Sequence, residues 1–449
     1  MRVAIATTVL AALVGVSPAA AQAPLAVLDR PVPQRLTLAD ALARATETSH
    51  VLGELKAREQ ASEAVHAQSK AADMPIVSAE GGYTRTNHVS VFGFTGDDGL
   101  FRVIYPDVPD NWRTRLDMQW PIYTGGRTQA LEKAADAERQ ASGKDLTAAR
   151  SDLTLETTRA FWALVTATES VRVVSESVTR VEGQLHDVKA RFDAGFLPPN
   201  DVLTVETRVA REHSLLIDAE NQRDGARASL ARLIGAPIDA TFDPDATLDV
   251  PAGVPASTTT LALAEQAKSG RADRQALLFR TQAADERIDA ARAGSRPQVA
   301  VAAGYDYARP NANIFPRQDA WKPSFQLGFN VAWTLFDGGR TAAEVAEARS
   351  LSTAVRERLA ELDTQIALEV RQRQLDLASA IAAVKPAADA VASATEARRV
   401  VQERFGAGVA TSSDLLDAQQ DQLEAELVRT RALANVKLAE ARLTRALGQ

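Results

Sequence analysis

An internal duplication constrains this chain more than any other feature of its sequence. The segment that begins at Trp120 reads WPIYTGGRT, and the segment that begins at Trp333, 213 residues later, reads WTLFDGGRT. The same spacing relates the motif RFDAG at Arg191 to the motif RFGAG at Arg404, with no gap between the two correspondences. A repeat of this length indicates that one structural unit is built twice, rather than two or three unrelated domains.

Both copies show the same order of elements. Each begins with an Ala- and Glu-rich helical segment, at about 36–73 and 259–295, which is followed by two strands, a long helix and a shorter return helix. The first repeat is expected over 24–235, with strands at about 76–86 and 112–123, a long helix at about 127–193 and a return helix at about 201–234. The second is expected over 259–449, with strands at about 298–307 and 324–336, a long helix at about 340–405 and a return helix at about 414–447.

Two segments fall outside this common pattern. Residues 236–258 are rich in Pro, Gly and Asp and predict a linker at the equatorial region between the repeats. Pro75 and Pro297 lie 222 residues apart, so the first copy holds nine extra residues downstream of Pro75, around 89–110. This insertion predicts a longer surface loop.

The long helices exclude a compact domain. At ~1.5 Å per residue each would extend roughly 100 Å. The return helices carry apolar residues at intervals of three, four and seven, as a packed coiled-coil seam requires. The helix before the strands and the return helix together match the length of the long one, so we expect them to stack end to end beside it.

The strands alternate between apolar and polar residues. In 324–336 and 112–122, aromatic and aliphatic side chains alternate with small or polar ones. Period-two alternation over about ten residues with aromatics near both ends is typical of a membrane β-barrel strand, although a soluble sheet with one wet face would alternate similarly. The polar positions are expected to line a barrel lumen; they are Arg113, Arg115, Asp117, Gln119, Gln326 and Asn330.

The N-terminus predicts export. Arg2, an apolar run and a small-residue stretch make residues 1–23 a signal peptide, with cleavage near Ala21 or Ala23. No later stretch approaches the ~18 consecutive apolar residues of a transmembrane helix. The chain has no cysteine, which excludes a disulfide framework and a lipid anchor on Cys, and its net charge of −7 is spread along the sequence, so nucleic acid is not an expected partner.

Four strands cannot close a barrel, and an open sheet edge is not tolerated in lipid. The chain must therefore oligomerise if the sheet enters a membrane. Two copies would give eight strands with a filled interior, whereas three would give twelve and a passage.

No catalytic or metal site is predicted. The Gly-Gly-Arg-Thr motif lacks the Lys-Ser/Thr of a phosphate loop, and the five His residues have no metal-ligand spacing. The acidic turn Gly96–Gly99 could bind a divalent cation, but a solvated loop tip is the favoured interpretation. We expect no enzymatic activity, no cofactor and no bound metal.

With these features together, the chain resembles the TolC-type outer-membrane efflux family, the outer-membrane factor of tripartite export systems. The resemblance covers the whole mature chain and is carried by the duplicated RFxAG turns and by the segments Asp201-Val-Leu and Asp414-Leu-Leu that follow them. It implies a mainly α-helical homotrimer, in which a 12-stranded β-barrel in the Gram-negative outer membrane continues as an α-helical tunnel into the periplasm. It also implies passive conduction of substrates to the exterior, with a periplasmic adaptor, an inner-membrane transporter and outer-membrane lipid as partners.

The resemblance also suggests site residues. It places the turns at 192–200 and 405–413 at the periplasmic mouth, where Arg191, Phe192, Gly195, Asp201, Arg404, Phe405 and Gly408 would form adaptor-docking tips. Asp414 and Asp417 match carboxylates that line the closed mouth, although an Asp in the first turn of a helix is also favoured by capping and by the helix dipole. Phe405 and Ala410 stand where known relatives carry polar residues that latch the mouth, so the latch is not explained.

Three other functions remain open. A diffusion porin would need many strands and little helix. A secreted coiled-coil scaffold or adhesin would explain the helices but not the paired strands, and a surface enzyme lacks a catalytic constellation. The residues do not distinguish drug, metal and protein as cargo.

Overall fold

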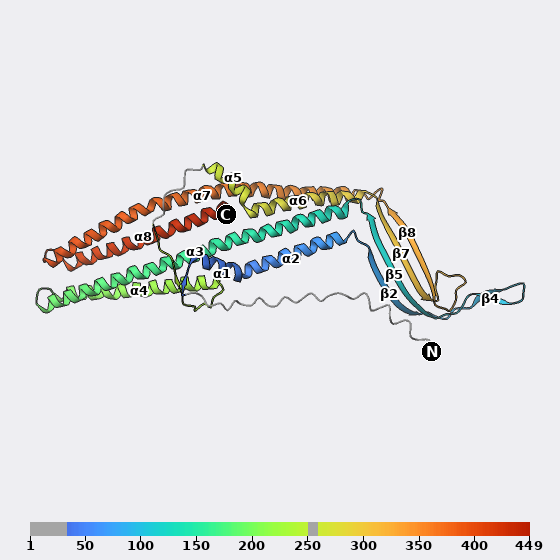
Figure 1. The fold of residues 1–449 in the computed structure, drawn as a ribbon, viewed down its shortest axis with the longest axis horizontal. Helices are drawn as coiled ribbons and strands as arrows, with labels where there is room; N and C mark the ends of the chain where they lie inside the picture. The colour runs from blue at the N-terminus through green and yellow to red at the C-terminus, as the bar shows by residue number, and fades with distance from the viewer. Residues whose placement is uncertain (1–33, 250–258) are drawn as a thin grey trace.

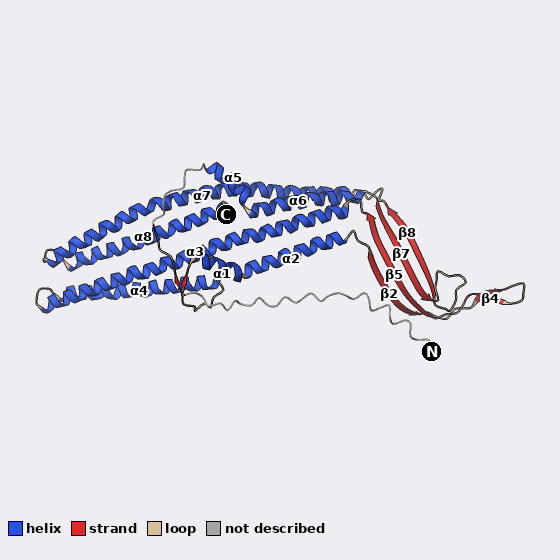
Figure 2. Ribbon diagram, viewed as in Figure 1, coloured by secondary structure: helices blue, strands red, loops and turns tan. Residues whose placement is uncertain are grey.

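The computed structural model describes residues 34–249 and 259–449. The expected signal peptide, the first residues of the first repeat and the end of the expected linker lie outside these ranges. The molecule is elongated, with the helices at one end and a small sheet at the other (Figure 1; Figure 2).

Two long helices run along the molecule. They are α3 (Arg127–Asp193) and α7 (Arg340–Gly406), each of 67 residues. Each begins directly after a Gly-Gly pair whose second glycine, Gly126 or Gly339, has φ of 89°. Only glycine adopts this left-handed conformation at little cost, so the pair makes the tight exit from strand to helix.

Shorter helices flank each long one. In the first repeat these are α1 (Leu38–Thr48), α2 (His50–Ala71) and α4 (Pro199–Leu233), all packed along α3. In the second they are α5 (Thr260–Gly270), α6 (Ala272–Arg292), the 3-10 turn η1 (Ala293–Ser295) and α8 (Ser412–Ala446), with α5, α6 and α8 packed along α7. Figure 1 shows α2 and α4 lying end to end beside α3.

The helical segments expected at 36–73 and 259–295 are each broken, which corrects the prediction of continuous helices. The breaks lie at Ser49 and Arg271, which are equivalent in the two repeats, and both residues have an extended backbone with ψ of 115° and 122°. The Ser49 hydroxyl accepts a hydrogen bond from the Leu52 amide and so starts α2. A single extended residue leaves the helical periodicity almost intact, which is why the sequence does not reveal it.

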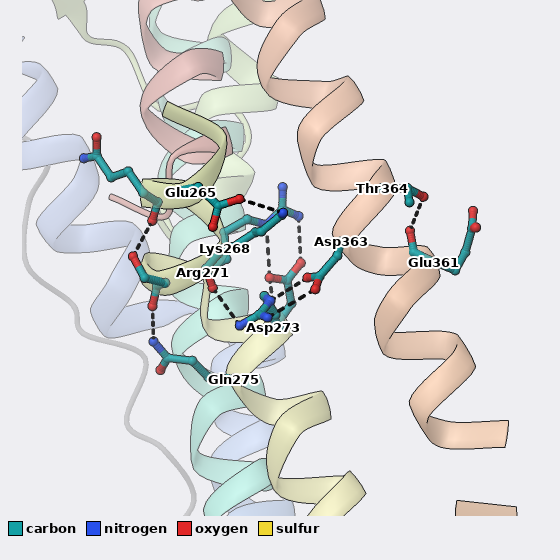
Figure 3. A network of polar contacts seen from close by, with 11 residues as sticks. Glu265, Lys268, Arg271, Asp273, Gln275, Glu361, Asp363 and Thr364 are labelled. Atoms are coloured by element: carbon teal, nitrogen blue, oxygen red, sulfur yellow. Dashed lines mark hydrogen bonds and ion pairs between the residues drawn. The ribbon is translucent and has the colours of Figure 1, made fainter. Parts of the chain in front are cut away.

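Arg271 holds the second break against α7 (Figure 3). Its buried guanidinium lies 2.7 Å from an Asp273 carboxylate oxygen and 2.5 Å from Glu369 of α7, and the next arginine, Arg274, pairs with Asp363 at 2.5 Å. Burial alone would raise the pKa of Asp273, but its hydrogen bonds with Arg271 outweigh this and lower it. The network therefore keeps its charges and fixes α5 and α6 to α7.

The helical part also contains a short pair of parallel strands. Strand β1 (Arg35–Leu36) pairs with β6 (Asp243–Pro244) over a buried cluster that includes Leu36, Phe161 and Phe242. Since β6 lies within the expected linker 236–258, the described part of that segment is partly ordered structure and not only a connection.

The main sheet contains four antiparallel strands in the order β2-β5-β7-β8. They are β2 (Ile76–Arg85), β5 (Asp110–Tyr123), β7 (Gln298–Arg309) and β8 (Lys322–Ala332). Within the described chain β2 and β8 each pair on one side only, so both edges of the sheet are open.

Two details of the strands differ from expectation. The last strand was expected to reach residue 336, but β8 ends at Ala332, opposite Gln298, where its partner β7 begins. The segment 89–110, which holds the nine extra residues, is not an irregular loop throughout, because it contains a hairpin of β3 (Phe92–Thr95) and β4 (Phe101–Tyr105) that projects beyond the sheet. Its flanking aromatic residues and the turn at Gly99, which has φ of 77°, explain the hairpin.

By composition and length, one described helix is apolar enough to cross a membrane. An 18-residue window of α7 has a mean hydropathy of 1.2, but only 17% of it is buried within this chain. Since α7 packs along α5, α6 and α8, it belongs to the helical part and leaves an exposed apolar side.

Candidate functional site

The strand register places all six expected lumen residues on one face of the sheet. Arg115 of β5 lies opposite Glu80 of β2 on one side and Asp306 of β7 on the other, and Asp306 lies opposite Ser324 of β8. Directly opposite residues point to the same face of the sheet, and so does every second residue along one strand. The polar face contains Arg113, Arg115, Asp117, Gln119, Gln326 and Asn330, together with Glu80 and Asp306.

The other face of the sheet is apolar and exposed. Leu116, Tyr305 and Phe325 share one row there, and Phe325 is 87% exposed. Further along β8, Leu327, Phe329 and Val331 continue this face, and all three are exposed. A continuous exposed apolar face marks a surface made for an apolar environment or a partner.

Ion pairs join the two repeats across the polar face. Asp306 is 5% exposed, and its carboxylate lies 2.6 Å from Arg113 Nε and 3.5 Å from an Arg115 terminal nitrogen. Arg115 Nε also lies 2.5 Å from Asp117. A buried carboxylate is tolerated when it is paired in this way. The sequence prediction missed Asp306, although its position between Tyr305 and Tyr307 carries the same alternation.

The helical tips are two similar turns. α3 and α7 each end in a turn with a left-handed glycine, Gly195 with φ of 79° and Gly408 with φ of 74°. The amide of Phe196 donates to the Arg191 carbonyl at 2.9 Å, and the amide of Val409 donates to the Arg404 carbonyl at 2.8 Å, as in a Schellman motif.

Each of these turns carries an exposed apolar side chain. Phe196 is 80% exposed and Val409 is 66% exposed. The sequence prediction concentrated on the repeated motif and missed both residues, which follow its two glycines directly. Of the expected docking residues, Phe192 and Arg404 are exposed, whereas Asp201 is half-buried in the first turn of α4.

Phe405 and Arg191 occupy a different environment from the other tip residues. Phe405 is buried and packs with Val188, Val205 and Leu415. Arg191 Nη1 donates a hydrogen bond of 3.0 Å to the Phe405 carbonyl oxygen, and its guanidinium lies over the Phe405 ring. The pair therefore links the α3–α4 hairpin to the α7–α8 hairpin, and Ala410 packs against the same cluster.

The two expected gate carboxylates lie on the exposed side of α8. Asp414 forms a capping box with Thr411, in which the Thr411 amide donates to Asp414 Oδ2 at 2.8 Å. This bond, with that of the Thr411 hydroxyl, lowers the pKa of Asp414 below its usual value of 3.8. Asp417 is exposed one turn later, and Asp421 and Glu424 continue the same exposed stripe, which the sequence prediction did not include.

Within 34–249 and 259–449, no three His, Asp or Glu residues are grouped so that they could hold a metal ion. Asp98, in the acidic turn of the insertion, is hydrogen-bonded to Arg102 at 3.1 Å.

Comparisons with known proteins agree with this geometry. The chain is 23% identical over 337 residues to the outer membrane protein TolC of Vibrio cholerae, which covers 74% of this chain and 76% of that one. It is 24% identical over 303 residues to the pyoverdine export outer membrane protein OpmQ of Pseudomonas aeruginosa, covering 68% and 62% of the two chains.

Solved structures share the fold. The outer membrane protein VceC of Vibrio cholerae superposes with a TM-score of 0.76 at 18% identity, covering 92% of this chain and 96% of that one. The CmeC outer membrane channel of Campylobacter jejuni gives a TM-score of 0.78 at 13% identity, covering 92% and 85%. The family model described as outer membrane efflux protein matches residues 41–236 and 263–449, and the chain belongs to this family of outer-membrane proteins.

Proposed function

We propose that this chain is the outer-membrane exit duct of a tripartite efflux or type I secretion system, through which substrates pass passively from an inner-membrane transporter and a periplasmic adaptor to the exterior. One observation carries the proposal. A sheet with one polar face, one apolar face and two open edges is attached to helices that extend roughly 100 Å. The apolar face suits the outer membrane, and the helices reach into the periplasm.

The open edges and the exposed side of α7 support a homotrimer. Three copies of the four-stranded sheet supply twelve strands, which are enough for a barrel with an open passage. Edge pairing between copies would remove the unpaired edges that lipid does not tolerate. The apolar window of α7, of which only 17% is buried in one chain, would be covered by a neighbouring copy.

The helical tips are the proposed docking surface for the adaptor. Phe196 and Val409 present exposed apolar side chains on turns of defined shape, and Phe192 and Arg404 lie beside them. Aromatic and arginine side chains, such as Phe192, Phe196 and Arg404, are enriched at protein interfaces.

Asp414 and Asp417 are the proposed carboxylates of the periplasmic gate. Three copies would place two acidic rings at the mouth, which would favour cations. The Arg191–Phe405 contact holds the two hairpins of one copy together beside these rings, so we propose it as the latch that replaces the polar residues of known relatives.

Single-channel conductance of the purified mature protein in a planar bilayer tests the proposal, with light scattering to measure the oligomer. Small, cation-selective openings are expected from a trimer, and Asp414→Asn with Asp417→Asn should reduce the cation preference. Asp389→Asn serves as the control, because it removes an exposed α7 carboxylate whose ion-pair partner within the described chain is Lys385 of the same helix. A folded trimer without channel activity would contradict the proposed duct function. Unchanged selectivity in the double variant would contradict only the assignment of Asp414 and Asp417 to the gate.

A further inference from the structure

The connection between β7 and β8 lies against the polar face of the sheet. It spans residues 310–321, at the end of the sheet away from the helices (Figure 1). Its Asn311 is 2% exposed, and the polar-face residues Asp306 and Ala308 beside it are 5% and 6% exposed. Loop residues and polar-face residues together line a cavity of about 370 Å³. The loop therefore covers part of the face that would line the duct.

Asparagine side chains fasten the loop to β8. Asn311 Nδ2 donates to the Lys322 carbonyl at 2.8 Å and to the Ser324 hydroxyl at 3.0 Å, and Asn313 Nδ2 donates to the same hydroxyl at 3.1 Å. Ser324 lies opposite Asp306, so this attachment is on the polar face and not on the apolar one.

Arg317 fastens the loop to the first repeat. Its backbone amide donates to the Ile104 carbonyl at 3.1 Å, and its Nη2 donates to Asn111 Oδ1 at 2.8 Å. The guanidinium also lies 4.9 Å from the centre of the Tyr105 ring and donates to its hydroxyl. One side chain thus joins the second repeat's loop to β4 and to the start of β5.

The cavity beneath the loop has an excess of positive charge. Its lining includes Arg113, Arg115 and Arg317, against the two carboxylates Glu80 and Asp306. Asp306 is paired with Arg113 and Arg115, and Asp117 is paired with Arg115, whereas Arg317 has no carboxylate partner among the described residues. This end of the polar face is therefore opposite in charge to the acidic tips of α8.

We infer that the 310–321 loop forms a second constriction, at the outer end of the duct, and that Arg317 determines its width and its preference for anions. The inference rests on the proposed function, because it requires the polar face to line the passage. In a trimer, three loops would project from the rim, each bringing an arginine toward the axis. Rings of charged side chains at a narrow point set ion selectivity, so the two ends of the duct would select in opposite senses.

The test compares two arginines of the same region in planar-bilayer recordings of the purified trimer. Arg317→Gln should raise single-channel conductance and shift the reversal potential toward that of K⁺. Arg85→Gln is the matched control, because Arg85 lies opposite Asp110 on the other face of the sheet and pairs with it at 3.2 Å, outside the 310–321 loop. It should leave both quantities as in the wild type, and Arg317→Lys, which keeps the positive charge, should leave the reversal potential as in the wild type.

A second variant tests the loop without removing Arg317. The chain contains no cysteine, so Asn313→Cys with Ser324→Cys introduces one defined pair. A short bifunctional methanethiosulfonate should bridge the pair and hold conductance low, and dithiothreitol should raise it reversibly. If the bridged and reduced forms have equal conductance and Arg317→Gln behaves as the wild type, the proposed constriction is wrong, while the wild-type channel still supports the proposed duct function. A wild-type trimer that forms no channel would overturn both.

Discussion

The guanidinium of Arg191 lies 4.7 Å from the centre of the Phe405 ring and donates a 3.0 Å hydrogen bond to the Phe405 carbonyl oxygen. The repeat makes Arg191 equivalent to Arg404 and Phe192 equivalent to Phe405, yet Arg404 and Phe192 are exposed. The duplicated sequence thus forms one asymmetric contact between its two copies.

Loss of this contact should loosen the closed mouth. A cation over a ring contributes ~0.5–2 kcal/mol, and a hydrogen bond with a charged group contributes ~1.5–3 kcal/mol. We therefore expect Arg191→Gln to raise the conductance and the open probability of the purified channel. Arg399→Gln is the control, because among the described residues Arg399 pairs with Glu396 and Glu403 of its own helix α7. Equal conductance in the two variants would show that Arg191 is not a latch.

Asp414 should keep its charge in mildly acidic medium. The amide and hydroxyl of Thr411 lower its pKa below 3.8, so its carboxylate protonates only as the pH falls through that lowered value. In Asp417→Asn, where Asp414 is the remaining proposed gate carboxylate, we expect cation preference to persist at pH 5 and to disappear only below 3.8. Reversal potentials recorded across a pH series measure this cation preference. A loss of the preference between pH 7 and 5 would contradict the role of Asp414 as a gate carboxylate.

Asp337 should stabilise the start of α7 in a pH-dependent way. Its carboxylate accepts hydrogen bonds from the Thr341 hydroxyl and amide and from the Gly339 amide, which lower its pKa from 3.8 to about 2. The folded pKa is below the unfolded one, so this stabilisation is complete above about pH 4 and is lost as the pH falls toward 2. Asp337→Asn should lower the melting temperature at pH 7 and not at pH 2, as measured by circular dichroism. An equal difference at both pH values would show that the charge is not responsible.

Only the apolar face of β8 should be destabilised by the introduction of an arginine. Phe329→Arg places a charge on the apolar face, where an arginine at the membrane midplane costs ~2–4 kcal/mol. Asn330→Arg places it on the neighbouring polar position. Urea titration of the protein folded into lipid vesicles should show destabilisation in the first variant alone. Similar destabilisation in both would argue against a lipid-facing apolar side.

The strand alternation and the helix lengths are local patterns, and together with the repeat they predicted most of the architecture. The helices expected at 127–193 and 340–405 correspond to Arg127–Asp193 and Arg340–Gly406, and the two Gly-Gly pairs lie at their starts. These features depend on backbone periodicity and on glycine conformation, which neighbouring residues determine.

Contacts between distant segments decided the rest. The burial of Asp306, the Arg191–Phe405 contact and the Arg317 anchor each join residues of different repeats. The end of β8 at Ala332 depends on where its partner begins. The sequence by itself determined the periodic elements and their order, because propensity and alternation act over a few residues. Only the tertiary structure decided which of two equivalent side chains is buried and where the loops lie, because these depend on the packing of one repeat against the other.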